Sequence, residues 1–343
     1  MEMRVLGGTG MSVSNLCLGA MMFGEIGNTD HDDCIRIVHR ALDAGINFID
    51  TADGYSRGES EEIVGKALKG RRDNVVLATK FFAGMGSDPN ERGASRRWIV
   101  REVENSLRRL GTDYIDLYQL HRFDVNTEID EVLFTLTELV RQGKIRTFGS
   151  SSFPADQIVE AQWTAQRRGY LPFRCDQSGY SIFRRDIERA VLPACQRYNM
   201  GMIVFSPLDG GYLSGRYKST ADFTDQSRVV SFSKRFHGGF NSEADDIQHK
   251  LLCVAELDKL AQEAGIPLAQ IVIAWTLEHP AVTSAIIGPR VMEHLETLLD
   301  ASELRLDPAI LDRIDEIVPP GTNLSGWNDS PNGLAVEARR RPR

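Results

Sequence analysis

The chain has 343 residues, enough for one large domain or two ordinary ones. Hydrophobic residues at 42% and charged residues at 26% are ordinary for a globular protein, and the net charge of −8 argues against nucleic acid or an anionic membrane as a partner. The N-terminus lacks the apolar core of a secretion signal, and no apolar run approaches the ~20 residues of a membrane span. The five cysteines form no C-x-x-C pair, so we expect reduced thiols and a cytoplasmic protein.

The first residues predict a β-hairpin followed by a strand that ends at Leu18-Gly19-Ala20-Met21. The glycines of Gly8-Thr9-Gly10 resemble the start of a dinucleotide-binding turn. They are followed by neither a third glycine nor a helix start, so a tight turn is the better interpretation.

Strand-like and helix-like segments then alternate along the chain. An acidic helix start at 29–33 leads to Gly45, and the strand at 46–50 follows. Apolar runs at 75–80, 114–120, 145–150, 173–177, 202–206 and 284–287 predict the later strands. Helical periodicity occupies the intervals, at about 59–69, 95–110, 128–141, 154–168, 186–198 and 247–264. It resumes after Pro267 up to Glu278, and a last helix follows Arg290.

This order gives eight strand–helix units and predicts an α/β protein, a (β/α)8 TIM barrel with an N-terminal β-hairpin. The competing doubly wound sheet requires a glycine-rich turn after its first strand, which is missing. We expect one domain over residues 1–320 and a C-terminal tail over 321–343. The polar segment 209–246 after strand seven is too long for a routine loop and is expected to act as a lid or binding loop.

Polar residues end three successive apolar strands. Asp50 ends the second strand, Lys80 the third and His121 the fourth, and Tyr55 stands just beyond Asp50. The carboxyl ends of barrel strands converge on one mouth, so we expect these four side chains to meet there.

Together the four residue types suit proton transfer to a carbonyl oxygen. A phenol has an ordinary pKa of about 10, and a neighbouring ammonium lowers that pKa by stabilising the phenolate. Asp50 is placed to keep Lys80 charged, and a neutral His121 can donate a hydrogen bond to the substrate oxygen. No side chain supplies a hydride, so a reduced nicotinamide is the implied partner.

Plainer interpretations remain for single residues. Asp50 alone is compatible with a capping acid, and Lys80 alone with its structural partner. A Schiff-base aldolase using Lys80 is a weaker alternative, because the predicted carboxylate keeps the lysine pKa high. No metal site is predicted, and Trp163 is expected on the core face of the fifth helix.

Six segments carry a resemblance to a known family. They are Asn47-Phe-Ile-Asp-Thr-Ala-Asp-Gly-Tyr55, Ala78-Thr-Lys80, Asp116-Leu-Tyr-Gln-Leu-His-Arg122, Phe148-Gly-Ser-Ser-Ser-Phe153, Phe205-Ser-Pro-Leu-Asp-Gly-Gly-Tyr-Leu-Ser-Gly-Arg216 and Ile287-Gly-Pro-Arg290. In this order and spacing they resemble the aldo-keto reductase superfamily. The chain is most similar to bacterial members that resemble potassium-channel β-subunits and aryl-alcohol or sugar-ketone reductases.

The resemblance implies roles for particular residues. Tyr55 is the implied general acid/base, Asp50 and Lys80 tune it, and His121 orients the carbonyl. The implied cofactor-binding residues are Ala20, Met21, Asp50, Ser151, Ser152, Gln177, Phe205, Ser206, Pro207, Leu208, Arg216, Gly288, Arg290 and His294. Within this set the resemblance places the nicotinamide carboxamide at Ser151, Ser152 and Gln177, and the nicotinamide ring on Phe205.

The implied cofactor is NADP(H), because Arg290 and a helix start both favour a phosphate. Gly179 stands where relatives often have a glutamate, and His294 where they often have a glutamine, which bears on cofactor preference. The expected partner is a small-molecule carbonyl substrate, with no nucleic acid and no membrane, and a homo-oligomer is compatible with the sequence. A cofactor-bound regulatory or scaffold subunit, as channel β-subunits are, stays open as the alternative function.

Overall fold

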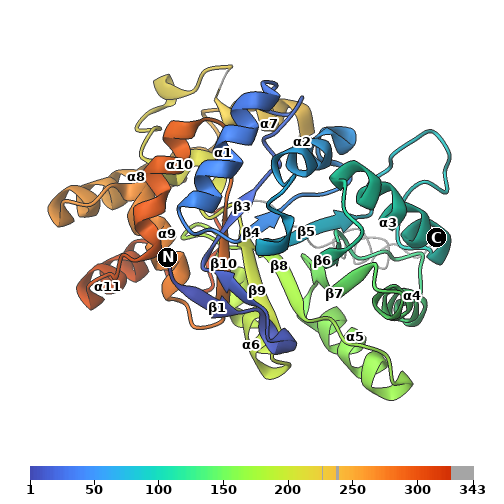
Figure 1. Cartoon of the computed structure of the whole chain (residues 1–343). Coiled ribbons are helices and arrows are strands. Elements are labelled where there is room, and N and C mark those ends of the chain that lie inside the picture. Colours follow the sequence, from blue (N-terminus) through green and yellow to red (C-terminus); the bar gives the residue numbers. More distant parts are fainter. Residues whose placement is uncertain (226, 237–238, 326–343) are drawn as a thin grey trace, which may run out of the picture.

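The computed structural model describes residues 1–225, 227–236 and 239–325. Its centre is a closed parallel barrel in the order β10-β3-β4-β5-β6-β7-β8-β9, surrounded by helices (Figure 1). The barrel strands are β3 (Leu16–Gly19), β4 (Phe48–Asp50), β5 (Val76–Phe81), β6 (Ile115–Leu120), β7 (Ile145–Ser151), β8 (Cys175–Gly179), β9 (Gly201–Phe205) and β10 (Val282–Ile287). The predicted (β/α)8 barrel is therefore confirmed.

The helices lie outside the barrel and follow the strands along the chain. They are α1 (His31–Asp43), α2 (Glu59–Ala67), α3 (Arg96–Leu110), α4 (Ile129–Arg141), α5 (Ala155–Arg168), α6 (Val191–Arg197), α8 (Asp245–Ala264), α9 (Leu268–Glu278), α10 (Met292–Leu299) and α11 (Pro308–Ile317). Local signals set several ends: the Asp30 side chain accepts from the Asp33 amide at the start of α1, and left-handed Gly111 ends α3. No single described helix is long and apolar enough to cross a membrane; α8 and α9 pass that test only as a pair bent by 94°.

The predicted N-terminal hairpin pairs β1 (Met3–Val5) with β2 (Ser12–Ser14) and closes the floor of the barrel. Leu6, which follows β1, and Val13, which lies in β2, pack against an apolar layer inside the barrel. The layer consists of Cys17, Phe48, Ala78, Leu117, Cys175 and Ile203. A floor sealed by apolar side chains leaves the opposite end of the barrel for polar chemistry.

Successive residues of a strand point to opposite faces, so every second residue enters the barrel. On β4, β5, β6 and β8, the residue two positions after the one in the apolar layer also points into the barrel, and it is polar in each case. These residues are Asp50, Lys80, Gln119 and Gln177. The strand pattern therefore builds one apolar layer and, above it, one polar layer at the mouth.

The long segment after β9, the seventh barrel strand, contains more structure than a loop. Two 3₁₀ turns, Asp209–Ser214 and Thr220–Asp222, precede the helix α7 (Arg228–Phe236). The sequence prediction of a long loop over 209–246 missed this helix, since its short apolar pattern is embedded in polar residues. The role of this segment as a lid or binding loop stays a prediction.

The chain after α11 returns to the barrel mouth. The amide of Arg185 donates to the Thr322 carbonyl (2.7 Å), and the amide of Leu324 donates to the Phe183 carbonyl (2.7 Å). Residues 322–324 therefore attach to the loop that follows β8. The rest of the predicted tail, residues 326–343, lies outside the described residues.

Candidate active site

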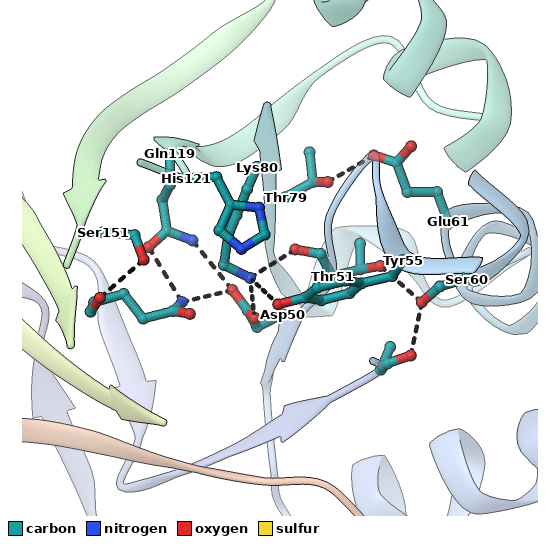
Figure 2. Close-up of polar contacts among 12 residues, drawn as sticks. Asp50, Thr51, Tyr55, Ser60, Glu61, Thr79, Lys80, Gln119, His121 and Ser151 are labelled. Atoms are coloured by element: carbon teal, nitrogen blue, oxygen red, sulfur yellow. Dashed lines mark hydrogen bonds and ion pairs between the residues drawn. The ribbon is translucent and has the colours of Figure 1, made fainter. Parts of the chain in front are cut away.

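The centre of the polar layer is an ion pair between Asp50 and Lys80, both buried. Lys80 Nζ donates to Asp50 Oδ1 (2.5 Å), to the Thr51 carbonyl (2.9 Å) and to the Tyr55 hydroxyl (3.3 Å), as Figure 2 shows. These contacts use all three N–H groups of an ammonium. The sequence prediction that Lys80 lies between the acid and the phenol is met by this geometry.

Tyr55 and His121 border the ion pair. Tyr55 begins a 3₁₀ turn whose next two residues, Ser56 and Arg57, have φ of 48° and 55°. Backbone in the left-handed region is uncommon outside glycine and turns the chain sharply after Tyr55. The Tyr55 and His121 rings meet edge to face with centroids 5.7 Å apart. All four predicted catalytic side chains therefore lie together.

The charges of this cluster follow from burial and neighbours. Burial opposes the charge on Lys80, but Asp50 and Tyr55 outweigh it and raise the pKa of the Lys80 amine above its usual value. Burial, with help from the Lys80 and Arg122 charges, holds the pKa of His121 well below 6.5, so its imidazole is neutral at neutral pH. A charged Lys80 also argues against the Schiff-base alternative.

One expectation about Tyr55 is wrong. The neighbouring ammonium was expected to lower the phenol pKa, and Lys80 does act in that direction. Burial is the larger influence, and the pKa of Tyr55 lies above its usual value of 10. The sequence predicted the sign of the pair interaction but not the extent of desolvation around the hydroxyl.

Two amides complete the surroundings of Asp50. Asp50 Oδ2 accepts from Gln119 Nε2 (3.1 Å) and from Gln177 Nε2 (2.8 Å). Gln177 was expected among the cofactor ligands, and in this structure its amide is directed to the acid. The sequence analysis missed Gln119, although its position two residues before His121 on the same strand face was the available signal.

Ser151 and Ser152 lie where β7 ends. The Ser151 hydroxyl donates to the Gln177 carbonyl (2.9 Å), and the Ser152 hydroxyl accepts from Arg122 Nη1 (3.0 Å). Ser152 has a φ of 57°, so the chain turns at this point. Both hydroxyls are therefore positioned at the mouth, next to the polar layer.

The predicted residues after β3 and β9 also reach the mouth. Buried Ala20 is fixed by hydrogen bonds from its amide to the Asp50 carbonyl (2.8 Å) and from the Ser60 hydroxyl to its own carbonyl (2.7 Å), while Met21 is half-buried. Phe205 ends β9 half-exposed, and a turn follows in which the Asp209 amide donates to the Ser206 carbonyl (2.9 Å). Within that turn Pro207 is buried and Leu208 half-buried.

A cationic cluster lies between the segment after β9 and the start of α10. Arg216 Nη2 contacts His294 Nε2 at 2.5 Å. Burial, followed by the charges of Arg216 and Arg290, lowers the pKa of His294, so the imidazole is neutral and accepts this hydrogen bond. The predicted phosphate residues Arg216, Arg290 and His294 therefore gather at one place beside Gly288.

Arg228 is a member of this cluster that the sequence analysis missed. It begins α7, and a Cβ built at Gly288 would have its nearest neighbour in Arg228 Nη1, at 3.9 Å. Burial lowers the pKa of Arg228, and the Arg290 charge adds to that effect. Among the described residues, no carboxylate lies within 4 Å of Arg216, Arg228 or Arg290.

This donor set fits an anionic cofactor. Three arginines without acidic partners in the described chain, an open backbone at Gly288 and the N-terminus of α10 are the groups that phosphates select. By contrast, no group of three or more His, Cys, Asp and Glu side chains able to hold a metal occurs in the described ranges. The fold and site thus define a barrel protein equipped for proton transfer beside an anion-binding cluster.

Comparison with known proteins agrees with this class. A family model described as the Aldo/keto reductase family matches residues 15–319. The uncharacterized oxidoreductase YrpG of Bacillus subtilis (strain 168) is 40% identical over 335 residues, covering 94% of this chain and 97% of its own. A "Probable voltage-gated potassium channel subunit beta" of Arabidopsis thaliana is 33% identical over 325 residues, covering 93% and 97%.

A third relative carries a substrate in its name. The versiconal hemiacetal acetate reductase of Aspergillus parasiticus is 32% identical over 345 residues, covering 93% of this chain and 98% of its own. The chain therefore belongs to the aldo/keto reductase family. The family and these relatives support an oxidoreductase that acts in carbonyl reduction.

Proposed function

We propose that the chain reduces an aldehyde or ketone to the alcohol with NADPH, with Tyr55 as the proton donor. The observation that carries the proposal is Lys80 Nζ, which bridges Asp50 Oδ1 and the Tyr55 hydroxyl beside a neutral His121. Such a set stabilises negative charge as it develops on a carbonyl oxygen.

The protonation states of Tyr55, Lys80 and His121 suit the reduction of a carbonyl. A raised pKa keeps Tyr55 protonated at neutral pH, so the proton is present when the carbonyl oxygen becomes basic. Lys80 donates toward the Tyr55 oxygen and stabilises the phenolate that remains. His121, whose pKa is lowered by desolvation and by the Lys80 charge, is neutral and can donate a hydrogen bond to the same carbonyl oxygen without adding a charge.

The cationic cluster is the proposed site of the cofactor phosphates. Arg216, Arg228 and Arg290 would hold the phosphates, and the start of α10 adds its backbone amides. When bound, the reduced nicotinamide supplies the hydride that no side chain provides. Arg290 beside the α10 N-terminus favours NADPH over NADH, since only NADPH carries the additional phosphate.

The replacement of Tyr55 with phenylalanine tests the proposed acid. We expect the Tyr55→Phe variant to bind NADPH as the wild type does and to lose about 99% or more of its turnover of 4-nitrobenzaldehyde, since general acid catalysis contributes roughly 10²–10⁴-fold. Cofactor binding is followed by quenching of protein fluorescence and turnover by absorbance at the nicotinamide band. Wild-type turnover in this variant would exclude Tyr55 as the acid.

The similarity to the potassium channel β-subunit of Arabidopsis favours a second function, a cofactor-bound regulatory subunit. Sustained turnover of NADPH with 4-nitrobenzaldehyde or a quinone supports the enzyme. Tight retention of NADPH with negligible turnover, together with a co-purifying partner, supports the regulator.

A further inference from the structure

Arg122 is a cation of the barrel mouth that the proposed reaction does not use. It follows His121 directly and reaches across to the end of β7. Its Nη1 donates to the His121 carbonyl (3.1 Å) and to the Ser152 hydroxyl (3.0 Å). These contacts fix the direction of the guanidinium and occupy the two N–H groups of Nη1.

The remaining donors of Arg122 have no protein acceptor in the described part of the chain. Neither its Nε nor its Nη2 makes a hydrogen bond there, and no carboxylate lies within 4 Å of the guanidinium. Its charge reaches the reacting groups: after burial and Lys80, it helps to hold down the pKa of His121. Asp176, a buried acid whose pKa is raised by desolvation and lowered in part by the Arg122 charge, makes no ion pair with the guanidinium within the described residues. Arg122 is therefore a fork with free donors beside the catalytic cluster.

The position of Arg122 separates it from the proposed phosphate site. The phosphate cations come from the segment after β9 and from the loop after β10, whereas Arg122 follows β6. In the closed order β10-β3-β4-β5-β6-β7-β8-β9, β6 lies four places from β10 and three from β9. Arg122 thus stands across the mouth from the phosphate cluster, on the His121 side.

We infer that the free donors of Arg122 form a subsite for a carboxylate on the carbonyl substrate, with the Ser152 hydroxyl holding the guanidinium in place. A guanidinium fork pairs with a carboxylate through parallel N–H donors. Ser152 accepts from Arg122 and keeps its own proton, so it stays able to contact the nicotinamide carboxamide where the resemblance places it. The preferred substrates are then oxo acids and formyl acids in place of neutral carbonyl compounds, an inference that rests on the proposed function.

The test compares each acid with its neutral methyl ester. Succinic semialdehyde and 4-carboxybenzaldehyde cover two distances between carbonyl and carboxylate, and kcat/KM is measured for both forms with wild type, Arg122→Met and Arg122→Lys. We expect the acid-to-ester ratio to fall about 10- to 100-fold in Arg122→Met for at least one pair, the range of a charge-assisted hydrogen bond. Arg122→Lys should lie between, since it keeps the charge and loses the fork.

Arg146→Met is the matched control. Arg146 lies exposed at the opposite end of β7, over the Tyr114 ring, and its removal changes net charge by the same amount. The ratio should stay at the wild-type value in this variant, and in wild type it should fall as salt is added. Thermal unfolding of each variant establishes that it is folded.

Two results overturn the subsite. One is an acid-to-ester ratio in Arg122→Met that equals the wild-type ratio or is matched by Arg146→Met. The other is an equal loss for acid and ester with a weaker NADPH Kd, which makes Arg122 a cofactor contact. If no aldehyde turns over, the proposed reaction is wrong, and the subsite is tested by calorimetry of 4-carboxybenzyl alcohol binding to the NADP-loaded chain. Loss of this binding in Arg122→Met supports the subsite. Equal binding in Arg122→Met and wild type overturns it.

Discussion

The Asp50–Lys80 pair offers a direct measurement of the interaction on which the proposed chemistry depends. The replacement Lys80→Met removes the cation and keeps a side chain of similar length. Asp50 is then left buried, and among the described residues only the amides of Gln119 and Gln177 still donate to its carboxylate. The replacement Asp50→Asn creates the opposite imbalance, a buried ammonium without its acid.

The size of the effect follows from burial. The Lys80 side chain is 0% exposed and that of Asp50 is 3% exposed, so solvent screens neither charge. Removal of one partner from a buried pair costs about 3–5 kcal/mol of unfolding free energy. Because two amides still contact Asp50, we expect about 3 kcal/mol for Lys80→Met. In the double variant neither charge is left alone, so its loss should be at least about 2 kcal/mol smaller than the sum of the two single losses.

Urea unfolding followed by circular dichroism gives the four free energies of this cycle. The control is the Arg313–Glu316 pair of α11, whose side chains are 54% and 62% exposed. Its cycle with Arg313→Met and Glu316→Gln should yield only about 0.2–1 kcal/mol. A coupling for Asp50 and Lys80 no larger than that of the control would refute the reasoning, and the argument that Lys80 stabilises the Tyr55 phenolate would lose its basis.

Two further expectations concern pH and cofactor choice. Burial holds the folded-state pKa of His121 well below 6.5, so the unfolded state binds the extra proton and the unfolding free energy should fall as pH drops below about 6.5. His121→Asn should show a shallower fall in urea titrations at successive pH values, and an unchanged slope would contradict the lowered pKa of His121. Arg290→Ala should raise the NADPH Kd about 10-fold or more with a much smaller change for NADH in fluorescence titrations, since hydrogen bonds to charged groups are worth about 1.5–3 kcal/mol. Equal weakening of both cofactors would remove Arg290 from the phosphate site.

The features that could be predicted from the sequence are those that depend on a short stretch of the chain. Each strand carries its own apolar pattern, and the carboxyl end of every barrel strand lies at the mouth whatever the loops do. Asp50, Lys80 and His121 could therefore be grouped before any contact was known. The N-terminal hairpin and the order of strands and helices were accessible for the same reason.

Contacts between distant segments could not be predicted in this way. Arg228 lies in a polar stretch with no motif, and only the folded chain brings it to Gly288. Trp163 shows a related failure, because it was expected in the core and is 55% exposed. The buried face of α5 runs through Ala161 and Ala165, and a residue two positions from each lies on the opposite side of the helix.

The pKa of Tyr55 shows why a correctly predicted contact does not give a correct pKa. The spacing along the chain indicates that Lys80 meets Tyr55, and a pair contact has a definite sign. Desolvation depends instead on every segment that surrounds the hydroxyl, and here it outweighs the ammonium. The result is a phenol that holds its proton until a stronger base forms next to it. In the proposed reaction an alkoxide would be such a base, so burial would retain the proton before reduction and Lys80 would stabilise the phenolate afterward.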